Sequence, residues 1–309
     1  MRVLLTGATG FIGAHTLRKL LEEGQTVAIL LRPTSDPWRI QDLLDRVTVL
    51  YGDLTHPQAL ASQLKPFQPE AIVHLAWQGV VNTQRNDVSQ IFENIPTSLE
   101  LIRLSAEAGC KHWIGLGSQA EYGPANRILS EDMPTSPTTL YGSSKLALRY
   151  LAEGLCNFYG MRFVWLRLFS AYGPMDSPHW LIPYLILTLL KGEHPKLTKG
   201  EQLWDYIFVS DVAEAICTVL REQQARGVFN LGSGEARPLR TIIETIRDNI
   251  DPSLNLGFGE VPYRPDQVMH LQADIGRLKA IGWEPKTPLE QGLKQTVEWY
   301  RANRNRYDS

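Results

Sequence analysis

Short apolar runs alternate with longer amphipathic segments along the first half of the chain. The runs are rich in Val, Ile and Leu and predict strands at residues 2–6, 26–31, 47–50, 71–75, 112–116 and 162–168. Segments between them, such as 11–23 and 140–159, carry leucines at helical spacing. Six such units predict an α/β fold, a doubly wound parallel Rossmann sheet with helices on both faces.

The alternation weakens after Gly173, where prolines become frequent, and this predicts a smaller second lobe. A strand at 206–209, a helix at 212–222 and a short strand ending at Gly232 are expected to return to the main sheet. The predicted division is therefore interleaved. The Rossmann domain takes residues 1–172 with about 205–232, and the C-terminal lobe takes about 173–204 with 233–309.

Composition excludes several classes of protein. The 309 residues carry a formal net charge of −2, with 43% hydrophobic and 21% charged residues, which is typical of a globular protein and gives no argument for binding nucleic acid or a membrane surface. Three widely spaced cysteines without a C-x-x-C pair indicate neither a disulfide framework nor a metal site, and favour the cytoplasm. The apolar run 180–190 is too short to span a membrane and predicts a buried helix.

A glycine-rich turn joins the first predicted strand to the first helix. It reads Gly7-Ala8-Thr9-Gly10-Phe11-Ile12-Gly13. Gly7 permits a tight turn, Gly10 lets the backbone approach a pyrophosphate, and Gly13 allows close packing of helix on strand. The free N–H groups at the start of the helix would face the phosphates. The turn, including Thr9, Phe11 and Ile12, therefore predicts a dinucleotide cofactor.

Arg32 bears on which dinucleotide binds. It follows Gly13 by 19 residues, at the end of the second predicted strand, where an NAD site usually has an acidic residue. An arginine there can pair with a 2′-phosphate, so NADP(H) is preferred over NAD(H), although Asp36 lies close by. Asp53 and Leu54, after the third strand, are expected against the adenine.

Tyr141 and Lys145 open a predicted helix at i, i+4 spacing, which places both on one face. A nearby ammonium lowers a tyrosine pKa towards the range useful for proton transfer. Ser118 ends a strand at the carboxyl edge of the sheet, where α/β folds bind ligands, and its hydroxyl can bond the substrate oxygen that Tyr141 protonates. Ser118, Tyr141 and Lys145 are therefore the candidate catalytic residues.

In this order the motifs resemble the extended short-chain dehydrogenase/reductase family, the NAD(P)-dependent sugar epimerases, dehydratases and reductases. The resemblance spans nearly the whole chain, and its further motifs are His74-Leu75-Ala76, Tyr122-Gly123, Arg167 to Pro174, Asp205-Tyr206, Val209 to Val212, Asn230 to Gly234, Arg264-Pro265-Asp266 and Gly282-Trp283-Glu284-Pro285. It implies that Leu75 and Ala76 also line the cofactor. It further implies a nucleoside-diphosphate sugar substrate, and a homodimer formed by long helices at 87–108 and 140–159.

Departures from the family pattern narrow the range of reactions that the chain is expected to catalyse. Gln119 and Ala120 stand where 4,6-dehydratases carry an acid/base pair, and neither exchanges a proton at neutral pH, so dehydration is disfavoured. Glu121 lies one position beyond this pair and is therefore interpreted as structural. Trp204 replaces a common diphosphate-binding arginine, which leaves Arg264 for that role.

Further substrate contacts are expected from three positions. Gln119 and Ser170 are candidates, Ser170 standing where the family often has asparagine. Trp77 either stacks on the substrate or packs in the core.

Similarity around Trp77 and the segment 117–123 points to reductases acting on nucleotide-linked 4-keto-6-deoxyhexoses. The main prediction is therefore NADPH-dependent reduction of such a ketone, in deoxysugar or surface-polysaccharide biosynthesis. Tyr141 would be the acid, Lys145 its pKa tuner and ribose anchor, and Ser118 the residue that orients the carbonyl. One alternative is an NAD-dependent C4 epimerase using the same residues, and another is a non-catalytic dinucleotide-binding sensor.

Overall fold

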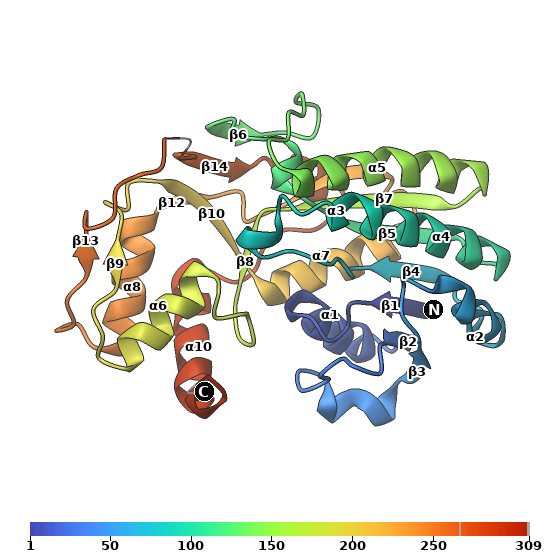
Figure 1. Cartoon of the computed structure of the whole chain (residues 1–309), viewed down its shortest axis with the longest axis horizontal. Coiled ribbons are helices and arrows are strands. Elements are labelled where there is room, and N and C mark those ends of the chain that lie inside the picture. The colour runs from blue at the N-terminus through green and yellow to red at the C-terminus, as the bar shows by residue number, and fades with distance from the viewer. Residues whose placement is uncertain (266, 308–309) are drawn as a thin grey trace.

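The computed structural model describes residues 1–265 and 267–307 of the chain (Figure 1). Within these residues, seven strands form one sheet in the order β11-β7-β5-β4-β1-β2-β3, and every neighbouring pair is parallel. The strands are β1 (Arg2–Thr6), β2 (Thr26–Leu31), β3 (Thr48–Tyr51), β4 (Ala71–His74), β5 (His112–Ser118), β7 (Arg162–Leu168) and β11 (Gly227–Leu231). The predicted parallel sheet is confirmed, with β3 shifted by one residue and β5 extended to Ser118.

Helices cover both faces of this sheet because successive strand residues point to opposite sides. Val3 and Leu5 of β1 join one core with α1 (Phe11–Glu22) and α7 (Val209–Arg221). Leu4 joins the other core, against the helices α2 (Ala61–Phe67), α4 (Asn94–Glu107) and α5 (Leu140–Phe158). This two-sided burial confirms the doubly wound arrangement.

A second lobe carries its own sheets. One has the order β12-β10-β14-β6, with β8 paired to β10, and a two-stranded sheet pairs β13 with β9. Their bounds are β6 (Arg127–Leu129), β8 (Ser170–Tyr172), β9 (Lys196–Leu197), β10 (Leu203–Phe208), β12 (Ala236–Pro238), β13 (Gly257–Phe258) and β14 (His270–Ala273).

The expected return of the strand at 206–209 to the main sheet is wrong. That segment belongs to β10, which pairs with β8, β12 and β14. The fully buried carboxylate of Asp205 explains the placement, since it accepts hydrogen bonds from the backbone N–H groups of Ser233, Gly234 and Ala273. Two parts of the interleaved segment do return as expected, since α7 packs on the main sheet beside α1 and β11 joins its edge. The lobe boundaries near residues 172, 205 and 232 stay a proposal.

Three helices pack against this second lobe, at one end of the molecule in Figure 1, with a core of their own. They are α6 (Leu181–Leu190), α8 (Leu239–Ile250) and α10 (Leu289–Ala302). The buried helix expected at 180–190 is α6. In the part of the chain that the structure describes, no helix is long and apolar enough to cross a membrane.

The single long helix expected at 87–108 is instead two helices. Helix α3 (Ser89–Phe92) ends before α4 begins at Asn94. Pro96 explains the break, because it has no N–H to donate to the carbonyl of Phe92 and prefers the first turn of a helix. The remaining short helices are α9 (Gly276–Ala280), η1 (Gln41–Arg46), η2 (Pro57–Leu60), η3 (Asn82–Gln84), η4 (Gln119–Glu121) and η5 (Arg304–Arg306).

Candidate active site

A cleft of about 1080 Å³ lies where the carboxyl ends of β1, β4 and β5 meet the second lobe. Its lining includes every candidate residue of the sequence analysis, namely Gly7, Thr9, Gly10, Phe11, Ile12, Gly13, Arg32, Asp53, Leu54, Leu75, Ala76, Trp77, Ser118, Gln119, Tyr141, Lys145, Ser170 and Arg264. Asp266, quoted in the arginine motif, lies outside the described residues. The fold thus brings together residues that are up to 257 positions apart in the chain.

The glycine turn forms a cradle that side chains would fill. Gly7 has a φ of +75°, and a Cβ on it would lie 2.8 Å from the backbone nitrogen of Ala76. A Cβ on Gly13 would lie 2.0 Å from the carbonyl oxygen of Gly7. The turn therefore needs glycine at both positions, and it leaves the N-terminus of α1 open to the cleft. These features fit a dinucleotide, whose pyrophosphate would lie against the turn.

Buried His74 ties the two strands beside this cradle. Its Nδ1 lies 2.8 Å from the hydroxyl of Thr6, and its Nε2 lies 3.0 Å from the hydroxyl of Ser98. Burial lowers the pKa of His74 to about 3, so the ring is neutral at physiological pH. The Thr6 hydroxyl also accepts a hydrogen bond from the N–H of Ala76 at 3.3 Å. The ends of β1 and β4 are therefore held in register where the cofactor is expected.

Two arginines line the part of the cleft that follows β2. Arg32 lies at the end of this strand, with Nε 3.5 Å from the hydroxyl of Ser35. Arg39, which the sequence analysis missed, donates to the carbonyl oxygens of Met175 at 2.8 Å and Thr9 at 3.2 Å. It thereby joins the glycine turn to the loop that opens the second lobe. No motif spacing marks Arg39, because its partners come from distant segments.

The Glu121 carboxylate holds the backbone of Ser118 in place. The Ser118 backbone N–H donates to the Glu121 carboxylate at 2.9 Å, and the Ser118 hydroxyl accepts from the N–H of Ala120. Trp165 and Arg167 donate to the same carboxylate at 2.9 and 2.7 Å. Glu121 is fully buried and paired with Arg167, so it is structural, as expected, and holds the end of β5 in place.

Tyr141 and Lys145 occupy the first turns of α5, on the face directed into the cleft. The hydroxyl of Thr139 caps this helix by accepting from the N–H of Gly142 at 3.1 Å. Burial raises the pKa of Tyr141, and hydrogen bonding to Ser118 only partly opposes this effect. The lowering of the Tyr141 pKa that the sequence predicted is therefore not found, because desolvation outweighs the nearby favourable interactions.

The Lys145 ammonium contacts a backbone carbonyl and the Trp77 ring. It donates to the carbonyl oxygen of Leu116 at 2.7 Å and lies 3.7 Å from the centroid of the Trp77 ring. Burial lowers the pKa of Lys145 to about 7.

Trp77 packs beside the candidate catalytic residues Tyr141 and Lys145. Its Nε1 donates to Gln90 at 2.7 Å, and its ring meets the Tyr141 ring edge-on at 6.1 Å between centroids. Both sequence interpretations of Trp77 therefore apply in part, since it packs while still lining the cleft.

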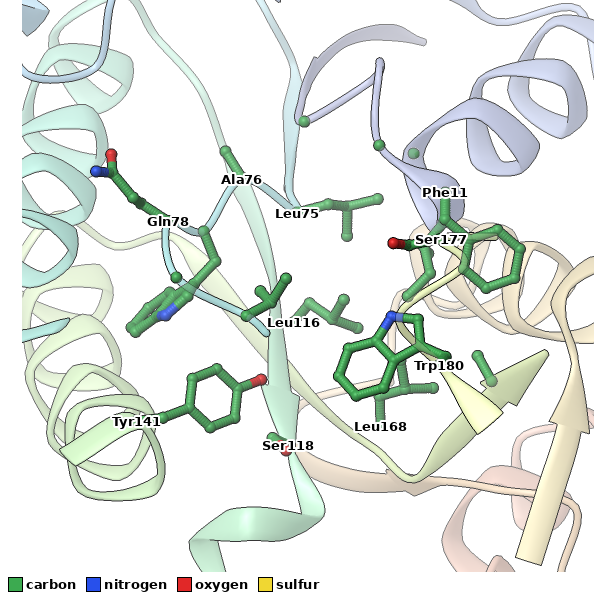
Figure 2. Close-up of a pocket in the computed structure, with 18 of the residues that line it drawn as sticks. Phe11, Leu75, Ala76, Gln78, Leu116, Ser118, Tyr141, Leu168, Ser177 and Trp180 are labelled. Carbon is green, nitrogen blue, oxygen red and sulfur yellow. The ribbon is translucent and has the colours of Figure 1, made fainter. Parts of the chain in front are cut away.

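The second lobe supplies the opposite wall. Trp180 faces Tyr141 across the pocket (Figure 2). Trp204, which replaces the expected arginine, donates from Nε1 to the hydroxyl of Ser170 at 2.8 Å and is thus tied to another predicted contact. Sequence reasoning missed Trp180 and also Arg85, which lies beside Tyr141. Both are in irregular segments, where no periodicity signals a role.

Among the described residues, no three His, Cys, Asp or Glu side chains gather as a metal would require. The cleft therefore offers a glycine cradle, a Ser-Tyr-Lys cluster and two aromatic walls. Such a set can hold a dinucleotide and transfer a proton to or from an oxygen beside it.

Comparison with known proteins places these features in a family. Residues 3–232 match the model of the NAD dependent epimerase/dehydratase family. A dTDP-glucose 4,6-dehydratase of Salmonella typhimurium is 26% identical, over 98% of this chain and 93% of the relative. The structure of the Thermus thermophilus UDP-glucose 4-epimerase in complex with NAD has a TM-score of 0.86 at 28% identity, covering 97% and 99% of the two chains.

A second epimerase structure adds a sugar nucleotide. The UDP-glucose 4-epimerase of Thermotoga maritima with UDP-glucose has a TM-score of 0.84 at 27% identity, covering 98% and 99% of the two chains. These proteins are dehydratases and epimerases, so the comparisons support the epimerase alternative better than the predicted reductase. The bound dinucleotide of the Thermus thermophilus structure is NAD, so the preference for NADP(H) remains a prediction.

Proposed function

Because the chain belongs to the NAD dependent epimerase/dehydratase family, we propose that it epimerises a nucleoside-diphosphate sugar at C4. The observation that carries this proposal is the cleft in which Ser118, Tyr141 and Lys145 lie beside the glycine cradle. The epimerase relatives support the same reaction class. Dehydration is disfavoured, because Gln119 and Ala120 lack proton-exchanging groups and the carboxylate of Glu121 is committed to Arg167.

A bound dinucleotide would supply the hydride acceptor and donor. Its pyrophosphate would lie on the glycine turn, its adenosine near Arg32, Asp53 and Leu54, and its nicotinamide end near Leu75 and Ala76. Lys145 would bond the adjacent ribose hydroxyls, for which its present bond to the Leu116 carbonyl leaves two N–H groups.

Tyr141 would move the proton at the sugar oxygen. As phenolate it takes the proton of the C4 hydroxyl while the carbon is oxidised, and as phenol it returns a proton to the alkoxide formed when the ketone is reduced. Ser118 would donate a hydrogen bond to the ketone oxygen and fix its orientation. Inversion requires the ketone to present its other face, so the sugar must turn within the cleft between these two half-reactions.

The remaining substrate contacts would come from both lobes. Arg264 would pair with the diphosphate, and Trp77, Gln119 and Ser170 would contact the sugar. We also propose that the protein is a homodimer, as the family resemblance implies.

A second candidate is NADPH-dependent reduction of a nucleotide-linked 4-keto-6-deoxyhexose. One observation favours it. Arg32 lines the cleft at the end of β2, and such a cation suits the 2′-phosphate of NADP(H), the cofactor of net reductions.

Product analysis distinguishes the candidates. Purified protein is given UDP- and dTDP-hexoses with catalytic NAD, and separately the corresponding 4-keto-6-deoxyhexoses with NADPH or NADH. Interconversion of the hexoses without net cofactor consumption is the expected result. Stoichiometric NADPH oxidation would instead establish the reductase, and inactivity in both assays would leave the non-catalytic sensor.

Tyr141→Phe is the matched control for either activity. It removes only the phenolic oxygen, so cofactor binding should persist while the rate falls by about 100-fold or more. Unchanged turnover would contradict the role of Tyr141.

A further inference from the structure

A guanidinium lies over the ring of the candidate catalytic tyrosine. The Cζ atom of Arg85 is 5.1 Å from the centroid of the Tyr141 ring and 6.0 Å from that of Trp180. Arg85 lines the cleft and comes from the loop after β4, just beyond η3. This places a positive charge where it interacts directly with the electrons of the phenol ring.

Backbone hydrogen bonds fix this arrangement. The N–H of Tyr141 donates to the carbonyl oxygen of Arg85 at 2.8 Å, and the N–H of Leu140 donates to Oδ1 of Asn86 at 3.1 Å. The loop therefore satisfies two N–H groups that the first turn of α5 would otherwise leave without partners. Arg85 and Tyr141 are thus tied together where the helix begins.

The Arg85 charge is not neutralised by a carboxylate. Across residues 1–265 and 267–307, its guanidinium makes no hydrogen bond or ion pair, and its Nε is buried without a partner. Arg167 of β7 is by contrast paired with Glu121. An uncompensated cation acts more strongly on its neighbours than a paired one.

Three other side chains that face Tyr141 carry less weight than Arg85. Lys145, on the same helix, lies farther from the tyrosine ring centroid, at 5.9 Å, and its ammonium is bound to the Leu116 carbonyl. Glu121, from η4, is paired with Arg167, and Ser118 of β5 is uncharged. The charge of Arg85 opposes the rise that burial causes in the Tyr141 pKa, and that of Glu121 adds to it.

We propose that Arg85 is a positioning residue for proton transfer, whose guanidinium stabilises the phenolate form of Tyr141. This inference rests on the proposed role of Tyr141 as acid and base. When the phenol gives its proton to the sugar alkoxide, the Tyr141 O–H bond breaks, a new O–H bond forms on the sugar, and the bonding electron pair stays on the phenolate. Arg85 keeps its own protons throughout, so the step is balanced without another reactant.

Direct titration of the phenol tests this without turnover. The holoprotein is labelled with 3-fluorotyrosine, whose more acidic phenol brings the titration to lower pH, and the Tyr141 signal in the ¹⁹F NMR spectrum is assigned with Tyr141→Phe. Arg85→Gln should raise the phenol pKa by about one unit or more, because an opposite charge within roughly 4–6 Å has been removed. Arg85→Lys should restore most of the shift, and Arg237→Gln, which removes an exposed charge outside the cleft, should cause none.

Kinetics give a second, independent readout. The limb of the kcat profile that rises with pH, which reports the phenolate acting as base, should move to higher pH in Arg85→Gln, and the rate at neutral pH should fall by about 10-fold, as one pKa unit implies. An unchanged phenol titration with a raised KM would overturn the proposal and assign Arg85 to substrate binding. Equal shifts in Arg85→Gln and Arg85→Lys would also overturn it, because charge would not be the cause. A shifted titration in a protein that neither epimerises nor reduces sugars would refute the proposed function, while the stabilisation of the Tyr141 phenolate by Arg85 would stand.

Discussion

At the residue scale, the carboxylate of Glu121 fixes the groups around Ser118 in the candidate site. It is fully buried and holds the Ser118 backbone, the Trp165 indole and the Arg167 guanidinium at once. A buried ion pair adds little net stability over an apolar pair, but the loss of one partner leaves a charge without compensation. Replacing Glu121 alone by a neutral residue is therefore expected to destabilise the fold.

Glu121→Gln should lower the free energy of unfolding by about 3–5 kcal/mol, because it keeps the side-chain size and leaves the Arg167 charge buried and unpaired. Urea denaturation measures this change. Glu235→Gln is the matched control, since its pair with Arg237 is exposed and should contribute less than about 1 kcal/mol. Similar losses in both variants would show that the Glu121 network is not needed.

Lys145 should make stability depend on pH. Its folded-state pKa of about 7 lies below the ordinary 10.5, so between these values the unfolded chain binds more protons than the folded one. Stability therefore rises with pH across this window. Between pH 7 and 9, the wild type should gain about 1–2 kcal/mol relative to Lys145→Met in urea denaturation. The exposed Lys191→Met should track the wild type, and parallel behaviour of Lys145→Met would contradict the lowered pKa.

At the scale of elements, two glycines of α5 differ in how closely other atoms surround them. A Cβ on Gly142 would lie 2.5 Å from the carbonyl oxygen of Ala120, so this glycine lets the start of the helix approach η4. A Cβ on Gly154 would meet nothing within 4 Å. Close approach at Gly142 is what brings Tyr141 to Ser118.

Two alanine substitutions in this helix should therefore have opposite effects. Gly142→Ala should destabilise the fold and reduce kcat, because α5 must move away from η4 and carry Tyr141 with it. Gly154→Ala should stabilise the fold by about 0.5–1 kcal/mol through helix propensity and leave kcat unchanged. Thermal unfolding and steady-state rates measure both, and an active, stable Gly142→Ala would refute the need for close approach.

At the scale of the whole molecule, one face carries exposed apolar side chains. Helices α3, α4 and α5 lie side by side over one face of the sheet (Figure 1). Phe92 and Phe158 on these helices are 74% and 80% exposed, and Tyr150 and Leu151 are also exposed. Apolar surface of this kind is suited to association with a second copy. It coincides with the helices through which the family resemblance implies dimerisation.

Sedimentation equilibrium should therefore find a dimer. Leu151→Glu should shift it to monomer, because it would bury a charge in the helical interface. Tyr51→Glu, on the edge strand β3 and 60% exposed, should leave the dimer intact. A monomeric wild type, or equal effects of both variants, would refute this interface.

Much of the fold and part of the site follow from local patterns. The strands of the main sheet, the glycine turn and the Tyr141/Lys145 spacing depend on residues close in sequence, so alternation and period were sufficient to predict them. The placement of β10 was missed, because the buried bonds of Asp205 to residues 28 or more positions away decide which sheet it joins. The break before α4 was missed although Pro96 signalled it.

The sequence by itself determined the fold class. It predicted the glycine cradle and the Tyr141/Lys145 pair from short-range spacing and Ser118 from its place at the end of a strand, and the roles of this cluster stay a proposal. Tertiary structure decided which charges act on that cluster. It turned Lys145 towards Trp77, buried Tyr141 so that its pKa rises, and brought Arg85 onto its ring. These effects depend on desolvation and on distances between segments far apart in the chain, and neither quantity is encoded in a local motif.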